Sequence, residues 1–202
     1  MKLSELRTFA RISVSTLKGS KFDDTYLDLL IKAGVRLTSQ MVECLTKTSY
    51  FNSLADIGEY KISENISDYC SIQESGIWWN IGTVSVPQWK QLQPVTKAFL
   101  DIETPSWRDA DSSTPDMYYI EGDIIGVHPK PDSALTNGFR LDHYRMPAEM
   151  TSDDQYPYEG ATKIPHLEIL DECIIAYVKW KASPIVGEEQ QENPYEAEFC
   201  VK

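Results

Sequence analysis

The sequence predicts an α+β protein in which a helical bundle, built from a long N-terminal helix and a C-terminal helix, carries a small antiparallel β domain. Apolar residues recur at helical spacing from Leu27 to Leu45, and a second helical pattern follows Pro165. Between them, short apolar and aromatic runs are separated by glycine and proline, as in strands and turns. We therefore expect one subunit over residues 1–202, with helical parts at about 4–47 and 165–202 and a β-rich part at about 50–147.

The N-terminal part is predicted to contain two helices. Ser4 can cap the first, a short one. The second is predicted to begin at Asp23, with Asp23 as its N-cap. Tyr26 and Leu29 widen its apolar stripe, so this helix is expected to be covered on more than one side, by the sheet and by another helix or a neighbouring subunit. Tyr26 and Leu29 are therefore candidate subunit-interface residues.

Residues 117–147 are predicted to form a three-stranded antiparallel meander. Gly122 suits a tight turn after the first strand, and Pro129 stops the second strand because proline cannot donate to a ladder. Asn137 and Gly138 open the third strand, in which apolar and polar residues alternate. Such a meander cannot bury its apolar face alone, so the helical segments on either side in sequence are its expected cover.

The remaining connections are less regular in pattern. Residues 88–100 fit either a helical turn or a connecting strand, and residues 103–116 read as a surface loop. Pro165 is placed as the first residue of the C-terminal helix. After an acidic linker, Asn193 opens a possible capping box for a last short helix, whose apolar residues are Tyr195, Phe199 and Val201.

Charge and composition exclude several classes of function. The formal net charge is −12, which argues against a surface that grips a phosphate backbone through clustered lysine and arginine. It is compatible with a surface that DNA slides past. No apolar run is long enough to span a bilayer, so no membrane association is expected. The N-terminus lacks a signal-peptide pattern, and the four scattered cysteines fit thiols in the cytosol of the producing cell.

No catalytic, cofactor-binding or metal-binding residues are predicted. The chain has three histidines and no Gly-x-Ser-x-Gly elbow. His166 and Glu168 match a zinc-deaminase pair, but the required Pro-Cys-x-x-Cys partner is absent. The segment that opens with Asp109 resembles a calcium loop but has threonine at its sixth position, where the loop requires glycine.

Tryptophan is concentrated in one part of the chain, at Trp78, Trp79 and Trp89. These side chains could line a sugar-binding surface, but large aromatic residues more often anchor a core or an interface. We therefore take Trp78, Trp79 and Trp89 as candidate subunit-interface residues.

The order of segments resembles the head-to-tail adaptor proteins of tailed bacteriophages, the group that includes the tail tubular A-type proteins of short-tailed phages. The resemblance spans most of the chain. The segments that carry it are Leu3–Leu6, Phe22–Ala33, Tyr118–Pro131, Leu141–Pro147 and the predicted helix Pro165–Ala182.

This resemblance implies a structural virion protein and no enzyme. It implies a ring, commonly of twelve copies, between the portal protein and a tail or nozzle protein, with double-stranded DNA passing through the lumen without sequence-specific binding. The protein would be assembled in the host cytoplasm and reside in the virion neck. The C-terminal segment with Tyr195, Phe199 and Val201 is the expected portal-docking element, ordering on contact.

Three rival interpretations have clear structural signatures. A carbohydrate-binding module would place Trp78, Trp79 and Trp89 side by side in a solvent-facing groove. A hydrolase would place two acids facing each other across a pocket. Another tail component, such as a tail completion protein, could share the same layout.

Overall fold

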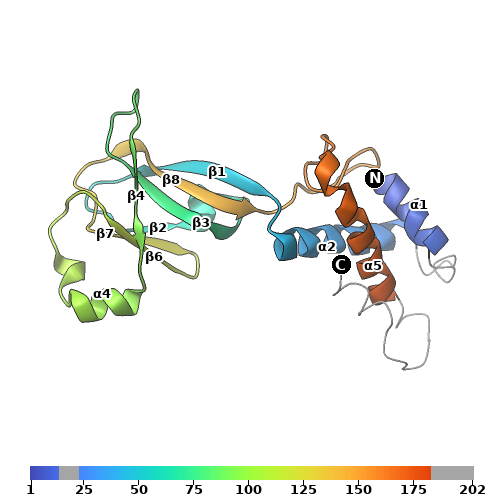
Figure 1. Ribbon diagram of the computed structural model, residues 1–202, viewed down its shortest axis with the longest axis horizontal. Helices are drawn as coiled ribbons and strands as arrows, with labels where there is room; N and C mark the ends of the chain where they lie inside the picture. The colour runs from blue at the N-terminus through green and yellow to red at the C-terminus, as the bar shows by residue number, and fades with distance from the viewer. Residues whose placement is uncertain (14–22, 183–202) are drawn as a thin grey trace. The chain divides into compact units, whose positions relative to one another are not determined.

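The computed structural model describes residues 1–13 and 23–182, and it divides into two compact units (Figure 1). One unit comprises Met1–Leu45 and Met146–Lys202, and we call it the helical unit. The other comprises Thr46–Arg145, and we call it the β unit.

The described helices of the helical unit are α1 (Leu3–Ser13), α2 (Asp24–Val42), a 3-10 helix η3 (Pro165–Leu170) and α5 (Asp171–Ala182). The predicted start of α2 is confirmed, because Asp23 accepts a hydrogen bond from the backbone N–H of Tyr26. The helix ends before Glu43, which adopts a left-handed conformation with φ of 49°.

The core of the helical unit lies where α1, α2 and α5 meet. Gly34 lets α2 approach α5 closely, since a Cβ at this position would lie 3.1 Å from the ring of Tyr177. Its fully buried apolar side chains come from all three helices and include Leu6, Ala10, Leu27, Ile31, Ile174, Val178 and Ala182.

Arg7 ties α1 to two other segments of the helical unit. Its guanidinium binds both carboxylate oxygens of Asp28 on α2, and it also contacts Asp153 in the loop before η3. These charge-assisted bonds are two-pronged and only 13% of the arginine side chain is exposed, so they are stronger than a typical surface ion pair.

The first sheet of the β unit has the order β1-β8-β3-β4, formed by β1 (Thr46–Ser53), β8 (Leu135–Arg145), β3 (Tyr69–Asn80) and β4 (Trp89–Gln91). All its pairs are antiparallel. A bulge interrupts the pairing of β3 with β8 between Ile72 and Ile77. Gly76 lies in this bulge with φ of 71°, which a residue with a side chain would resist.

The second sheet has the order β2-β7-β6-β5, formed by β2 (Glu59–Lys61), β7 (Ile124–His128), β6 (Met117–Glu121) and β5 (Gln93–Pro94). It is mixed, because β5 runs parallel to β6 while the other pairs are antiparallel.

The main core of the β unit contains side chains of both sheets. Phe139 of β8 stacks on Phe51 of β1 at 4.9 Å between ring centroids, and the edge of Tyr60 of β2 meets it at 5.2 Å. Helix α3 (Ile62–Asn65) adds Ile62 to this cluster.

A smaller core lies on the other face of the second sheet. Tyr118 belongs to the main core, so its neighbour Tyr119 points to the opposite face. There Tyr119 packs with Leu100 of α4 (Lys97–Glu103) and with Trp107 of the 3-10 helix η2 (Trp107–Asp109).

The predicted fold class, a helical bundle with a small antiparallel β domain, is wrong. Most of the helices are short, and no long N-terminal helical bundle exists in the described residues. The dominant element is the β unit, with two four-stranded sheets, one of them mixed. The short runs between residues 50 and 94 pair with the later strands, which enlarges the β part beyond the predicted meander.

The predicted meander over residues 117–147 is also wrong. Strands β6 and β7 form the expected hairpin around Gly122, which has φ of 60°. Strand β8 does not continue that sheet and lies between β1 and β3 in the first sheet. The prolines after β7 end its strand pairing, as predicted. Strand β8 then pairs with β1 and β3, which are both longer than β7. One face of the hairpin is covered by the first sheet, and on its other face Tyr119 packs with α4 and η2.

Three local predictions are also resolved. Helix α1 begins at Leu3, and the Ser4 hydroxyl donates to the carbonyl of Asp153 instead of capping the helix. Residues 88–100 contain both alternatives, two short strands and the start of α4. The predicted surface loop at 103–116 contains η2, and Trp107 is buried.

Candidate functional site

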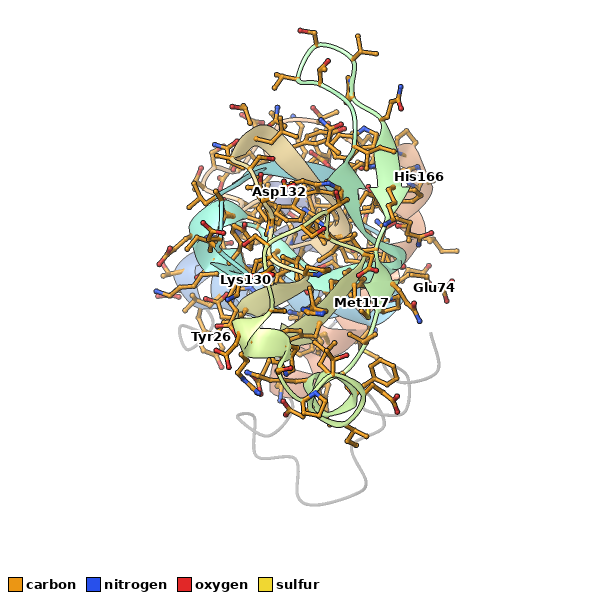
Figure 2. The ribbon with its side chains drawn as sticks, turned by 90° about the vertical axis from the view of Figure 1, so that its left-hand side faces the viewer. Tyr26, Glu74, Met117, Lys130, Asp132 and His166 are labelled. Carbon is orange, nitrogen blue, oxygen red and sulfur yellow. The ribbon has the colours of Figure 1, made fainter. Side chains whose placement is uncertain are left out.

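The most distinctive surface of the β unit is the hairpin of β3 and β4. Its loop, residues 81–88, projects beyond the strands in both views (Figures 1 and 2). The Asn80 side-chain oxygen holds the loop ends by accepting hydrogen bonds from the backbone N–H groups of Gly82, at 2.9 Å, and Gln88, at 3.1 Å. A Cβ on Gly82 would lie 2.3 Å from the Val86 carbonyl oxygen, so only glycine fits this close approach.

Apolar side chains are exposed at the tip of this hairpin. Ile81, Val84 and Val86 have 54%, 56% and 64% of their surface exposed. Solitary exposed apolar residues are ordinary, but three within six positions concentrate apolar surface on one projecting loop. Such patches typically mark interaction surfaces.

Two aromatic rings extend this patch at the base of the loop. Tyr50 of β1 and Trp89 of β4 lie with ring centroids 5.6 Å apart. With Val84 and Pro87 they line a hollow of about 170 Å³. The hollow also contains Asn80, Thr136 and Asn137, and none of its lining residues is charged.

The three predicted tryptophans occupy different environments. Trp79 is 5% exposed and packs on Phe139 in the main core, at 4.9 Å between ring centroids. Trp78 points to the opposite face of β3, where the guanidinium of Arg140 lies 5.4 Å from its ring centroid. The three do not form one solvent-facing aromatic groove, the signature expected of a carbohydrate-binding module.

The predicted interface residues of the helical unit lie on α2. Leu29 is exposed over 61% of its surface, whereas Tyr26 is half-buried and packs against the helical core. Their interface role stays a prediction. Tyr195, Phe199 and Val201, the predicted portal-docking residues, lie outside the described residues.

A second surface in the helical unit is the outer face of α1. Phe9 and Ile12 are exposed there, and with Met1, Ser4, Glu5 and Thr8 they line a shallow groove of about 460 Å³. Leu6 and Ala10 of the same helix are buried, whereas Phe9 is exposed.

A hollow lined by several ionisable side chains lies in the β unit and measures about 380 Å³. Lys130, labelled in Figure 2, donates to the carbonyl of Arg108 at 2.7 Å, and Arg108 in turn binds Asp101. The carboxylates of Asp56 and Glu59 accept hydrogen bonds from the hydroxyls of Ser112 and Tyr119. Its lining is Asp56, Ile57, Gly58, Glu59, Trp107, Arg108, Val127, His128 and Lys130.

This arrangement does not match a hydrolase with paired acids. A general acid needs burial that raises the pKa of its carboxyl group, whereas Asp56 and Glu59 are both exposed. Burial lowers the pKa of His128 despite the opposing charge of Asp116, which favours the neutral imidazole. The lining contains no serine, threonine or cysteine that a base could activate.

The other two histidines of the chain do not line this hollow. His143 is fully buried in β8, where its Nδ1–H donates to the Tyr144 carbonyl and its Nε2 accepts from the Ser49 hydroxyl, 3.0 Å away. His166 lies at the start of η3. Within residues 1–13 and 23–182, no three His, Cys, Asp or Glu side chains are grouped to hold a metal ion.

The sequence-based search did not single out Tyr50, Val84 or Val86. One signal pointed to Val84 and Val86, though not to Tyr50: residues 75–96 contain a single charged residue, Lys90, in a chain that is 25% charged. No described helix is long and apolar enough to cross a membrane.

Comparison with known proteins supports the adaptor resemblance. No curated protein matches the chain. The family model of the SU10 adaptor protein matches residues 1–199, nearly the whole sequence. The chain therefore belongs to the SU10 adaptor protein family, a family of phage head-to-tail adaptors that are structural components of the virion neck.

Proposed function

We propose that this protein forms a closed ring, of twelve copies, between the portal protein and the tail or nozzle protein of a tailed phage. Each copy acts as one adaptor subunit over residues 1–202. The whole-chain match to the adaptor family is the observation that carries this proposal. Rings of this kind assemble in the host cytoplasm and are carried into the virion neck.

Ring closure needs two different surfaces on each subunit that meet head to tail. Each has to bury on the order of several hundred Å². Exposed apolar side chains are present in both units, at the β3–β4 loop and on α1 and α2. Tyr26, Leu29, Trp78 and Trp89 are further interface candidates.

We further propose that double-stranded DNA passes through the ring without being bound by sequence. The net charge of −12 supports this role, because carboxylates facing DNA phosphates within a Debye length of about 8 Å repel them. An acidic channel wall therefore keeps DNA from adhering as it passes. Replacing wall carboxylates by lysine is expected to slow DNA ejection, and unchanged ejection kinetics would count against this role.

Portal docking is assigned to the segment from Asn193 to Lys202, with Tyr195, Phe199 and Val201 as its apolar anchors. Deleting this segment is expected to abolish portal binding and to leave the thermal unfolding temperature unchanged. Portal binding by the truncated protein would refute the assignment.

Mass measurement of the purified protein, alone and mixed with portal, tests the ring directly. The expected species has twelve times the subunit mass of 23.0 kDa. A protein that stays monomeric in both samples would overturn the proposed function.

A further inference from the structure

We propose that the β3–β4 hairpin of one copy seats in the apolar groove on α1 of the next copy. This inference rests on the proposed ring and assigns the two surfaces that would close it. It specifies a second copy of this chain as the partner of both surfaces.

The hairpin is built as a projecting element with few charged residues. Lys90 is its only charged residue over positions 75–96. The loop is held in shape by its own bonds: the Ile81 N–H donates to the Gln88 carbonyl at 2.8 Å, and the Thr83 N–H donates to the Val86 carbonyl at 3.1 Å. A loop fixed in this way loses little conformational entropy when it docks.

Its apolar side chains point away from the protein's own core. Val86, Val84 and Ile81 are each more than half exposed, and Tyr50 and Trp89 continue the same surface at the loop's base. Burying them would remove apolar area from water at about 25 cal/mol per Å². Monomeric proteins rarely leave such a patch uncovered.

Charge identifies a second copy as the partner that fits. Two chains of net charge −12 repel each other, so contact between copies is favoured at surfaces that carry few carboxylates. A basic partner would be recognised through the abundant Asp and Glu side chains instead. The hairpin, whose projecting loop carries no charged residue, is therefore suited to a partner that is itself acidic.

The groove on α1 has matching character. Phe9 and Ile12 are its exposed apolar side chains, and Glu5 is the one charged side chain among its lining residues. The two arginines of α1 are directed elsewhere: Arg7 binds Asp28 and Asp153, and Arg11 binds Asp24. The groove therefore offers an apolar receptor on an otherwise charged helix.

The two surfaces lie on different units of the chain, so their contact between copies is heterologous. A heterologous contact repeats from copy to copy and gives a ring when the rotation closes. A contact of the hairpin with another hairpin would instead be isologous and would stop at a dimer. A pairing of the hairpin with α1 therefore meets the requirement of a ring that two different surfaces make each contact.

The first experiment places a charge in each surface of the full-length protein. Val86→Glu in the hairpin and Ile12→Glu in the groove are each expected to raise the subunit dissociation constant at least tenfold, measured by sedimentation over a concentration series. Ile102→Glu on α4 and Ile169→Glu on η3 are the matched controls, since both residues are exposed aliphatics outside the two surfaces. All four variants should unfold at the wild-type temperature.

The second experiment locates the contact. A photo-crosslinking amino acid replaces Val86, and equal amounts of isotopically labelled and unlabelled protein are mixed before assembly. The expected products join position 86 of one copy to residues 1–13 of another. Crosslinks to any other segment would overturn the assigned groove.

These measurements separate the two proposals. A wild-type protein that forms no ring, alone or with portal, would remove the proposed function and this inference with it. A ring that forms normally with both Val86→Glu and Ile12→Glu would overturn the inference alone and leave the proposed function standing.

Discussion

The hydroxyl of Tyr119 donates a 2.6 Å hydrogen bond to the carboxylate of Glu59, although β7 separates their strands. Gly126 of β7 is the register partner of both residues. The tyrosine ring therefore lies over the glycine, and a Cβ at position 126 would be 2.0 Å from the ring's Cζ. The missing side chain of Gly126 is what allows this bond across the sheet.

Gly126→Ala is expected to destabilise the β unit. The added methyl group forces the Tyr119 ring off its position, which costs about 1–3 kcal/mol as overpacking does elsewhere. Backbone entropy alone would favour alanine over glycine by roughly 0.5–1 kcal/mol. A decrease in the free energy of unfolding would therefore show that the clash with the ring outweighs this gain. Urea denaturation measures the free energy of unfolding.

The control for this prediction is the double-mutant cycle with Tyr119→Ala. Once the ring is gone, alanine at position 126 has nothing to displace, so the two losses should not add. Strictly additive losses would show that the ring and the glycine are not coupled.

Trp79→Ala is expected to destabilise the fold far more than Trp89→Ala. Trp79 fills the main core beside Phe139, and removing a buried aromatic side chain costs about 3–5 kcal/mol. Trp89 is half-exposed on edge strand β4, so its loss should cost about 1 kcal/mol or less. Equal losses for the two variants, measured by urea denaturation, would contradict this assignment of core and surface.

Local sequence signals predicted the parts of the fold that depend on few neighbours. The Asp23 cap, the turn at Gly122 and the helical start at Pro165 each rest on residues within one or two turns of chain. Strand pairing depends on residues distant in the chain. The alternation of apolar and polar residues in β8 fits the third strand of a meander as well as a central strand of another sheet. The sequence therefore could not choose between the two sheets.

The candidate site was only partly accessible to the same reasoning. Consecutive residues of a strand point to opposite faces, so Trp78 and Trp79 could not have shared one platform, and the sequence alone could exclude it. The uncharged run at 75–96 was equally visible. That its centre projects as a loop depends on the pairing of β3 with β4, which is set by contacts distant in the chain.

Arg7→Met is expected to destabilise the helical unit by about 1–3 kcal/mol, since Asp28 loses a two-pronged, partly buried partner. Arg11→Met on the same helix is the matched control. Its contact with Asp24 is more exposed, and such pairs contribute roughly 0–1 kcal/mol. Burial should protect the Arg7 ion pairs from screening, so the difference in stability between the two variants should shrink little in 0.5 M salt. Thermal unfolding at low and high salt measures this difference.

Stability is expected to fall as the pH drops below about 6.5. Burial lowers the pKa of His143, and the nearby Lys47 adds to this, against smaller opposing effects of the Tyr144 carbonyl, Asp68 and Asp142. Because the folded-state pKa lies below the unfolded value, the unfolded chain binds more protons in this window, and the free energy of unfolding rises with pH across it. His128 acts in the same direction.

The His143 contribution can be isolated by measuring the free energy of unfolding from pH 7.5 down to 5 for the wild type and for His143→Gln. Glutamine does not titrate, so the variant should show a shallower decline, in which the His128 contribution remains. Proton NMR of the imidazole ring gives the second measurement, with an expected pKa below 6.5. A His143 ring that titrates at or above that value would mean that its environment stabilises the charged form, contrary to its fully buried position between Ser49 and the Tyr144 carbonyl.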